Sequence, residues 1–384
     1  MGDTSMKSIR RYKEPILFLL ILNAVLISLA LSMGLSNLLN TLMNTAYRLL
    51  MDTAFYLMAI TTVMSAFAQM LSEFGVVALL NHLLSALMKP IYNLPGAASL
   101  GIVLTYLTDN PAILSITGNL EYRGYFKKYQ LPALTNLGTS FGMGLIVTTF
   151  VLGLVPHNGE NLVGAVLMGN LGAIIGSIVS TRLMLHFTKK RYGTDDEVLN
   201  RGVYEKAIEE AAKKKSIGER VLSGILDGGA KGVELGMAII PGVLIMCTIV
   251  FLLTNGPSAD GTYTGAAFEG IGLLPKIADK LNFILQPLFG FSSNKGITVP
   301  ITSLGAAGAS LSIIKDLYAT GYANAHDIAV FVSMSLCWSG YLSTHVAMMD
   351  GLGFKEMTGK AILCHTIGGL CAGIATNWLY SLLF

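Results

Sequence analysis

Residues 90–125 read PIYNLPGAASLGIVLTYLTDNPAILSITGNLEYRGY, and residues 287–322 read PLFGFSSNKGITVPITSLGAAGASLSIIKDLYATGY. The two stretches align at a constant offset without a gap, which marks them as an internal repeat. The residues that recur are Pro90/Pro287, Thr105/Thr302, Leu107/Leu304, Ala112/Ala309, Leu114/Leu311, Ser115/Ser312, Ile116/Ile313, Leu120/Leu317, Gly124/Gly321 and Tyr125/Tyr322. Each apolar run is broken near its middle, so we expect each stretch to form a helical hairpin rather than one continuous helix.

Composition places the chain in a membrane. Of its 384 residues, 53% are hydrophobic and only 13% are charged, and the mean hydropathy is +0.61. Because a soluble domain carries about a quarter charged residues, we expect an integral membrane protein. The four cysteines lack metal-ligand spacing, and the chain has no Gly-rich phosphate loop or nucleophile elbow. We therefore expect no enzyme, no catalytic or metal site, no bound cofactor and no nucleic-acid partner.

Several segments are long and apolar enough to cross a bilayer core of about 30 Å. They are 15–33, 52–72, 131–154, 161–187, 232–254, 328–349 and 358–384. Between them lie the apolar pieces 94–119 and 291–317, whose halves of about a dozen residues reach the midplane and return. We therefore expect two re-entrant helical hairpins.

The distribution of Lys and Arg indicates the orientation. Basic residues precede the first span, and Arg123 and Lys127 follow the first hairpin. The loops 156–160 and 255–270 carry neither Lys nor Arg, so they fall on the other side. This pattern predicts a multi-pass protein of the bacterial cytoplasmic (inner) membrane with a cytoplasmic N-terminus.

The repeat extends beyond the hairpins. In the last span of each unit, Gly172 is opposite Gly368 and Ser180 is opposite Thr376. Each unit has three spans and one hairpin, and an odd number of spans inverts the second unit. We predict an all-α membrane protein built as this inverted repeat, preceded by one extra N-terminal transmembrane helix. The predicted division is 1–46 for the cytoplasmic N-terminus and extra helix, 47–187 for the first unit, 188–231 for a charged cytoplasmic connector and 232–384 for the second unit.

The connector holds much of the charge of the chain. Tyr204, Ile208 and Ile217 are spaced as on one face of an amphipathic helix. We expect a helix that lies on the membrane surface or packs against the protein, with a regulatory ligand site as the alternative.

The tip of the first hairpin carries the sharpest candidate residue. The chain turns at Thr108, Asp109 and Asn110, and Pro111 suits the first position of the next helix. A carboxylate near the membrane midplane is costly and usually handles a substrate, an ion or a proton. The alternative is structural, because Asp109 as a helix cap would satisfy its own backbone.

The second tip, at residues 305–308, consists of glycine and alanine and offers no polar side chain. Gly305 and Gly308 let a ligand approach closely, and the helix that starts there offers free N–H groups. A pocket between the two tips would suit a polar or zwitterionic solute.

The spans that follow the hairpins are rich in glycine and hydroxyl groups, so we expect discontinuous helices around a cavity. The candidates are Asn136, Thr139, Ser140, Ser335, Trp338, Ser339 and His345. Trp338 would stack on a ring-bearing solute, and His345 and His365 would relay protons. Close helix packing with hydrogen bonds between helices is the alternative for each of them.

The Pro-headed hairpins, the small-residue tip and the Gly-Tyr exits resemble the nucleoside-recognition (Gate) domain family. That family includes the core of concentrative nucleoside transporters, the gates of bacterial ferrous-iron transporters and the spore maturation proteins. The resemblance covers about 47–187 and 232–384, and it implies hairpins and unwound helices around a central site, often in an oligomer. Only Asp109 and Asn110 offer a side-chain set comparable to the acidic motif with which concentrative nucleoside transporters bind ribose and sodium.

These features together favour a secondary active transporter that works by alternating access with H⁺ or Na⁺ coupling. The resemblance implies a small polar, nucleoside-like solute, and the expected partners are that solute, membrane lipid and, in some members, further copies of the chain. The alternatives are a translocase or exporter of a lipid-linked or envelope component and a non-transporting membrane partner protein.

Overall fold

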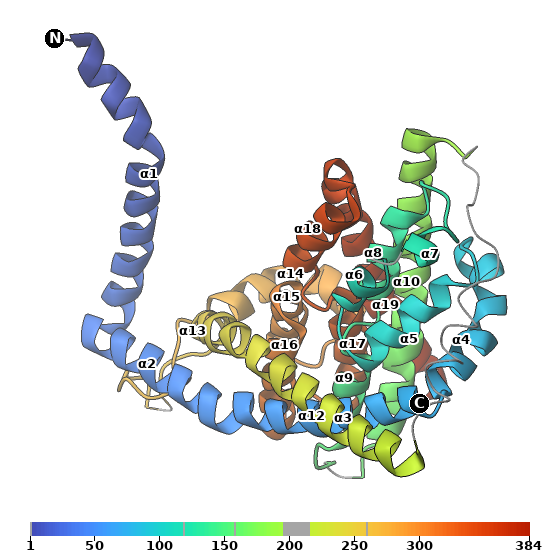
Figure 1. Ribbon diagram of the computed structural model, residues 1–384. Coiled ribbons are helices and arrows are strands. Elements are labelled where there is room, and N and C mark those ends of the chain that lie inside the picture. The colour runs from blue at the N-terminus through green and yellow to red at the C-terminus, as the bar shows by residue number, and fades with distance from the viewer. Residues whose placement is uncertain (1, 118–119, 157–158, 195–215, 259) are drawn as a thin grey trace.

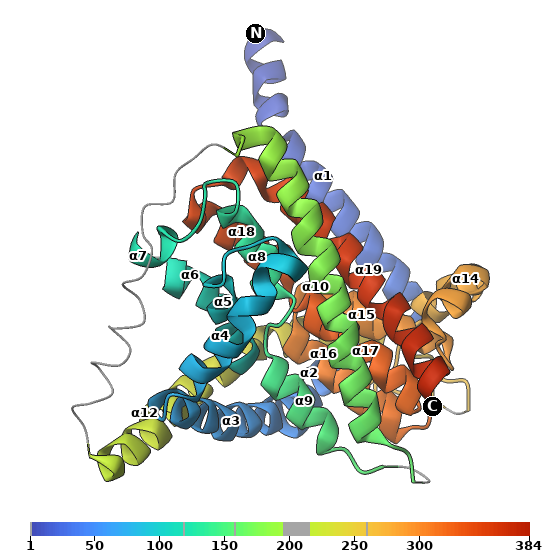
Figure 2. The ribbon, with the colours of Figure 1, turned by 90° about the vertical axis from the view of Figure 1, so that its right-hand side faces the viewer.

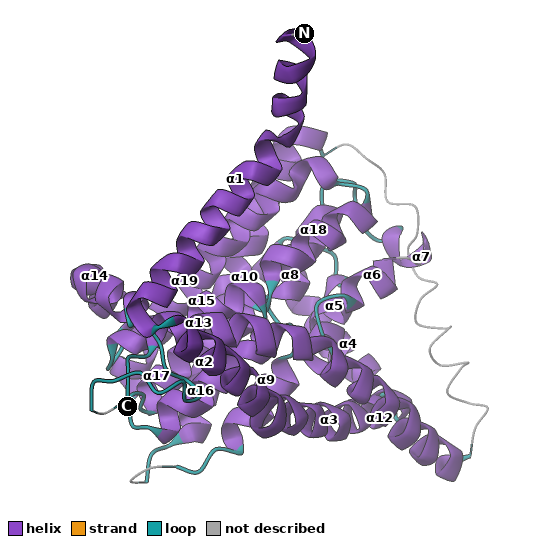
Figure 3. Cartoon of the chain, turned by 90° about the vertical axis from the view of Figure 1, so that its left-hand side faces the viewer, coloured by secondary structure: helices purple, strands orange, loops and turns teal. Residues whose placement is uncertain are grey.

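The computed structural model describes residues 2–117, 120–156, 159–194, 216–258 and 260–384. Over these residues the chain forms helices and loops without a strand (Figure 3). α1 stands apart from the rest of the molecule (Figure 1). The first half contains α1 (Gly2–Met33), α2 (Leu35–Arg48), η1 (Leu49–Ala54), α3 (Phe55–Glu73), α4 (Val76–Leu87), η2 (Met88–Tyr92), α5 (Ala98–Leu107), α6 (Ala112–Thr117), α7 (Leu120–Arg123), α8 (Leu131–Thr139), α9 (Gly144–Leu152) and α10 (Leu162–Tyr192). The second half contains α12 (Ile217–Pro241), η3 (Gly242–Cys247), α13 (Thr248–Thr254), α14 (Leu273–Phe289), η4 (Asn294–Ile297), α15 (Thr298–Gly305), α16 (Ala307–Ala319), α17 (Ala325–Trp338), α18 (Tyr341–Leu352), η5 (Lys355–Met357) and α19 (Thr358–Leu383). The all-helical prediction is confirmed.

Several of these helices are long and apolar enough to cross a membrane. Within the described residues there are 6 of them: Tyr12–Met33, Leu35–Glu73, Leu131–Leu152, Leu162–Tyr192, Ile217–Thr254 and Lys355–Leu383. Their outward faces carry large apolar side chains, as lipid requires. The chain is therefore a multi-pass membrane protein, as predicted.

The predicted span 328–349 is two helices instead of one. α17 ends at Trp338 and α18 begins at Tyr341, because Ser339 and Gly340 leave the helical conformation, with φ of 14° and 67°. α8 and α9 are separated in the same way, and Met143 has φ of 57° between them. Both breaks fall in the segments whose glycine and hydroxyl content predicted discontinuous helices.

Each of the two repeat stretches contains a pair of short helices joined by a tight connection, and each pair is called a helical hairpin below. α5 and α6 are joined by a turn over 108–111, in which the Ala112 N–H donates to the Asp109 carbonyl over 3.0 Å. α15 and α16 are joined at Ala306, whose extended backbone (φ −160°, ψ 117°) is enough to reverse the chain. The hairpins bring their tips toward the two helix breaks.

The long helices α3 and α12 cross along one side of the molecule (Figure 1). A glycine at every fourth position of α12 faces α3 in turn: Gly224 lies against Met70, Gly228 against Ala66, Gly232 against Thr61 and Thr62, and Gly236 against Met58. Because the partner numbers fall as the glycine numbers rise, the two helices are antiparallel. Small residues at this spacing allow two helix backbones to approach closely in lipid.

α10 and α19 also pack side by side (Figure 2). Gly172 lies against Thr376, the carbonyl of Gly368 lies against Gly176, and Gly368 lies against Ser180. This pair of helices is therefore antiparallel as well. Hydrophobic residues around the pairs form two main clusters, one centred on α17 and the other on the α5–α6 hairpin.

A buried carboxylate closes the loop between α13 and α14. Glu269 accepts hydrogen bonds from the Ser258 hydroxyl (2.7 Å), the Thr264 hydroxyl (2.7 Å) and the Gly265 N–H (3.0 Å). Burial by itself would raise the pKa of Glu269, but the hydrogen bonds from Ser258, Thr264 and Gly265 outweigh it and hold this pKa below its usual value. The Thr41 hydroxyl also donates to Glu269, over 3.4 Å, which joins the loop to α2.

Some elements differ from the expected layout. α2, α4 and α14 were not predicted. α4 is apolar but has only 12 residues, and polar residues interrupt the apolar runs of α2 and α14. α12 begins at Ile217 and runs through the boundary predicted at 231, so the end of the connector belongs to a long helix. The connector positions Tyr204 and Ile208 lie outside the described residues.

Candidate functional site

The breaks in the two discontinuous helices meet at the centre of the fold. The Ser339 hydroxyl donates to the Gly142 carbonyl over 3.1 Å, and the Cys337 thiol donates to the Ser140 hydroxyl over 3.8 Å. Ser140 and Ser339 are fully or almost fully buried. The structure thus brings these two predicted site residues together from opposite halves of the chain.

Asn110, at the first hairpin tip, inserts where the two helix breaks meet, a place called the crossing below. Its Nδ2 donates to the Ser339 carbonyl over 2.5 Å and approaches the Thr344 hydroxyl at 3.5 Å. A Cβ on Gly142 would collide with Asn110 Oδ1, so glycine is required there. Asn110 therefore attaches the hairpin tip to the breaks in both helices.

Thr108 and Asp109 face away from the crossing and line a cavity of about 640 Å³, called the tip cavity below. Its other walls come from α3, α4, α5 and α12. The lining residues are Ser65, Ala68, Gln69, Ser72, Val77, Leu104, Leu107, Thr108, Asp109, Pro111, Ala112, Lys231, Glu234, Leu235 and Ala238. Asp109 Oδ1 accepts the N–H of Asn110 over 2.7 Å. The carboxylate is half-buried and faces a space large enough for a small solute.

The second hairpin tip is packed shut. The Gly340 N–H donates to the Ser303 carbonyl over 2.8 Å, and Gly308 lies against the Ile239 side chain. The tip cavity is lined by the first tip and by neither Gly305 nor Gly308. The expected pocket between the two tips is therefore replaced by a cavity at one tip, because the small residues of the other pack directly against the neighbouring helices.

Ser335 belongs to a hydroxyl cluster beneath the second tip. Its oxygen lies 3.0 Å from that of Ser303 and accepts a hydrogen bond of 3.0 Å from Ser310. All three residues are buried, and they connect α17 to both arms of the second hairpin.

A buried polar chain crosses four helices beside the breaks. The amide of Asn136 donates to Ser180 over 2.9 Å, and Ser180 lies 2.9 Å from His365 Nδ1. His365 Nε2 is 2.5 Å from the Cys337 carbonyl. A carbonyl only accepts, so Nε2 carries a proton. Asn136 therefore helps to position His365 through Ser180 rather than facing the tip cavity.

Several polar atoms near the centre are buried and have no hydrogen-bond partner among the described residues. They are Asn110 Oδ1, Thr135 Oγ1, Asn136 Oδ1, Thr139 Oγ1, Trp338 Nε1 and both ring nitrogens of His345. The His345 ring lies 4.6 Å from that of His365. Because buried polar groups are nearly always paired, these atoms mark places for water, an ion or a polar solute.

Trp338 packs against Gly369 of α19 and lies outside the lining of the tip cavity. The indole ring fills the space that a side chain at position 369 would occupy. The stacking role expected for Trp338 is therefore replaced by helix packing in this conformation.

Sequence reasoning missed the α12 wall of the tip cavity. Lys231 and Glu234 both line it, and the Lys231 ammonium donates to Gln69 Oε1 over 3.1 Å. A lysine and a glutamate three residues apart at the start of an apolar run were the available signal. In the part of the chain that the structure describes, no group of three or more His, Cys, Asp or Glu side chains is placed to hold a metal.

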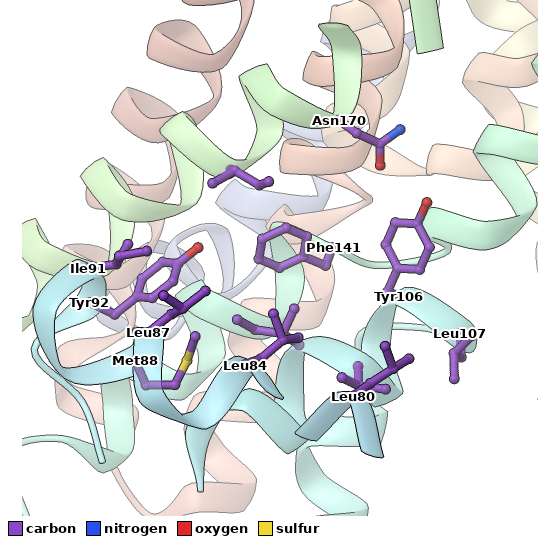
Figure 4. A pocket seen from close by; sticks show the side chains of 13 residues that line it. Leu80, Leu84, Leu87, Met88, Ile91, Tyr92, Tyr106, Leu107, Phe141 and Asn170 are labelled. Carbon is purple, nitrogen blue, oxygen red and sulfur yellow. The ribbon is translucent and has the colours of Figure 1, made fainter. Parts of the chain in front are cut away.

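A second cavity, of about 400 Å³, lies between α4, α5 and α10 (Figure 4). Leucine, isoleucine and other apolar side chains line most of it. The Tyr92 hydroxyl forms a hydrogen bond of 2.8 Å with the Ser177 hydroxyl. The Thr148 hydroxyl lies 3.1 Å from the Tyr106 hydroxyl and accepts a hydrogen bond of 3.3 Å from the Asn170 amide. The polar groups of this apolar cavity are therefore already hydrogen-bonded.

Comparison with known proteins leaves the family open. No protein-family model and no curated protein matches the chain. One similar solved structure is a doubly substituted form of CNTnw, a concentrative nucleoside transporter, in an outward-facing state. It has 13% sequence identity and a TM-score of 0.49, and the alignment covers 86% of this chain and 75% of that one. A likeness of this degree assigns no function to the chain.

Proposed function

We propose that the chain is a secondary active transporter that moves a small polar solute through the tip cavity by alternating access, coupled to H⁺ or Na⁺. The observation that carries the proposal is the position of Asp109. Its carboxylate stands at the tip of a helical hairpin and faces a cavity of about 640 Å³ between that tip and α12. An ionisable side chain at membrane depth usually serves substrate, ion or proton binding.

The helix pairs support an inverted repeat of the units 47–187 and 232–384. Each half has a long first helix, a short amphipathic helix, a hairpin, a broken helix and a long last helix, in that order. In sequence Gly172 corresponds to Gly368 and Ser180 to Thr376, whereas in space Gly172 meets Thr376 and Gly368 meets Ser180. A two-fold axis between α10 and α19, as proposed here, would produce this exchange of partners. The hairpins would then enter the membrane from opposite faces.

The ends of the α10–α19 pair support the same orientation. At one end Lys127 bonds the Thr194 carbonyl and Tyr192 bonds Glu356, both over at most 2.7 Å. At the other end, next to the start of α10, Tyr318 bonds Glu160 over 2.9 Å. The basic loop after the first hairpin and the exit from the second hairpin therefore lie at opposite ends of long helices, in keeping with the positive-inside rule.

A movable tip supplies the gate. Asn110 is attached to the crossing by its bonds to the Ser339 carbonyl and Thr344, and a buried hydrogen bond of this kind contributes about 1 kcal/mol net. Breaking it is compatible with a tip that opens when solute binds. The unpartnered atoms of His345 and Asn110 are the proposed places for the coupling ion. The resemblance in sequence makes a nucleoside-like solute the first candidate.

Uptake into proteoliposomes tests the proposal. Asp109→Asn keeps the size of the side chain and its bond to the Asn110 N–H but removes the charge. We expect at least a 10-fold loss of uptake with unchanged folding. Asp227→Asn, on the exposed face of α12 outside the cavity, is the matched control. Full uptake by Asp109→Asn, or absence of uptake for every polar solute tested with the unchanged protein, contradicts the proposal.

The apolar cavity favours a second candidate, a translocase or exporter of a lipid-linked component. A cavity of about 400 Å³ whose polar groups are satisfied suits an acyl chain better than a polar solute. Leu84→Trp would fill this cavity. A loss of lipid-linked substrate transfer in Leu84→Trp, with solute uptake intact, would support this candidate over the first.

A further inference from the structure

Three charged groups of both signs face the tip cavity. Asp109 comes from the first hairpin tip, and Lys231 and Glu234 come from one face of α12. Two carboxylates and one ammonium leave the lining with one net negative charge. Such a lining differs from that of a cavity for an uncharged solute, which is built from apolar groups and a few neutral polar ones.

None of the three is in an ion pair with another described residue. The ion pairs in the described part of the chain join Arg48 to Asp52 and Lys355 to Asp350, at the surface. Lys231 donates only to the neutral Gln69, over 3.1 Å. Asp109 is half-buried, whereas Lys231 and Glu234 are exposed beside the cavity. The three charged groups are therefore free to bind a ligand that enters it.

We propose that the tip cavity takes a small zwitterion with a primary ammonium and a carboxylate, of the α-amino-acid type. This inference rests on the proposed transport function and names its substrate class. The ammonium of the solute would bind Asp109 and Glu234. Its carboxylate would bind Lys231 and the amide of Gln69, which has N–H donors left to give.

The charge balance explains why a zwitterion fits better than a nucleoside. A neutral solute would leave all three charges without a charged partner once the cavity closed, which is unfavourable for ions removed from water. A zwitterion pairs all three and leaves one negative charge in the lining. One H⁺ or Na⁺ bound at Asn110, next to Asp109 in the chain, would offset that charge, which gives the coupling ion a definite role in closure.

Binding of paired probes to the purified full-length protein tests the inference. L-Serine carries both charged groups, ethanolamine carries only the ammonium, and uridine carries neither. Isothermal titration with Na⁺ present would measure all three on the unchanged protein, Lys231→Gln and Asp109→Asn. Lys280→Gln, on the exposed face of α14 away from the cavity, is the matched control.

The expected result is specific to the group removed. Lys231→Gln should weaken L-serine binding at least 10-fold and leave ethanolamine binding unchanged, whereas Asp109→Asn should weaken both at least 10-fold. Lys280→Gln should bind all probes as the unchanged protein does. Equal weakening of both amines by Lys231→Gln would overturn the assignment of the carboxylate to Lys231.

Failure of the inference is distinct from failure of the proposed function. Binding and uptake of uridine, with no binding of L-serine or other amino acids, would overturn the zwitterion and leave transport standing. Absence of binding and of uptake for amino acids and nucleosides alike would overturn both.

Discussion

The glycine stripe of α12 predicts that two adjacent glycines respond in opposite ways to the same substitution. A Cβ on Gly228 would lie 2.6 Å from the Ala66 Cα and 2.6 Å from the Ser65 carbonyl, both backbone atoms of α3. A Cβ on Gly229 would meet nothing closer than the Thr62 methyl, at 3.9 Å. Gly228→Ala must therefore push the helices apart, whereas Gly229→Ala fits.

The difference between the two variants isolates the helix contact. Gly→Ala in a helix stabilises by about 1 kcal/mol through propensity, and this gain is common to both variants. Overpacking costs about 1–3 kcal/mol and applies only to Gly228→Ala. We therefore expect Gly228→Ala to be less stable than Gly229→Ala by about 1–3 kcal/mol.

Unfolding of the purified variants in mixed micelles, followed by circular dichroism, measures this difference. Gly232→Ala should behave as Gly228→Ala does, since its Cβ would lie 2.5 Å from the Thr62 Cα. Equal stability of Gly228→Ala and Gly229→Ala would refute the close antiparallel packing of α3 and α12.

Two further predictions concern single polar side chains. The pKa of Glu269 is held low in the folded loop, so the ionised side chain stabilises the protein above the ordinary value of 4.5, and this stabilisation is lost as pH falls through the lowered pKa. The melting temperature of the unchanged protein should exceed that of Glu269→Gln at pH 7 and approach it near pH 3. A constant difference between the two melting temperatures across that range would argue against the depressed pKa. Asn110→Ala leaves the buried Ser339 carbonyl without its donor, so it should lower the free energy of unfolding in denaturant by about 1–3 kcal/mol. Asn23→Ala, on exposed α1, is the control and should leave this free energy unchanged. Equal stabilities of the two variants would show that the tip is not attached at Ser339.

The parts of the fold that sequence predicted correctly are those with a strong local signal. Pro111 and the polar residues before it end α5, and the run from Ser339 to Gly340 ends α17, because these residues disfavour a continuous helix. α4 and α14 were missed because neither is a full span. α4 is apolar but has only 12 residues, and polar residues such as Lys276 interrupt the apolar run of α14.

The sequence identified site residues with a conspicuous local pattern, but not those that only long-range packing brings to the cavity. Asp109 was identified because a carboxylate at a hairpin tip is conspicuous in an apolar sequence. Lys231 and Glu234 were not, since only the crossing of α12 over α3 brings them to the same cavity. The four-residue glycine spacing of α12 was the available sign of that crossing. Asn136 and Trp338 were chosen for polarity and size, properties that packing residues share with binding residues.

The most direct test of a solute path through the tip cavity is the accessibility of one cysteine from each face of the membrane. Ala238→Cys places a thiol on the lining of the cavity, and Val233→Cys places one on an exposed part of the same helix outside it. We expect a membrane-impermeant maleimide to label Ala238→Cys in both right-side-out and inside-out vesicles, above the labelling of the parent chain. We expect it to label Val233→Cys in neither. Labelling of Ala238→Cys from one face only, with and without solute, would contradict alternating access.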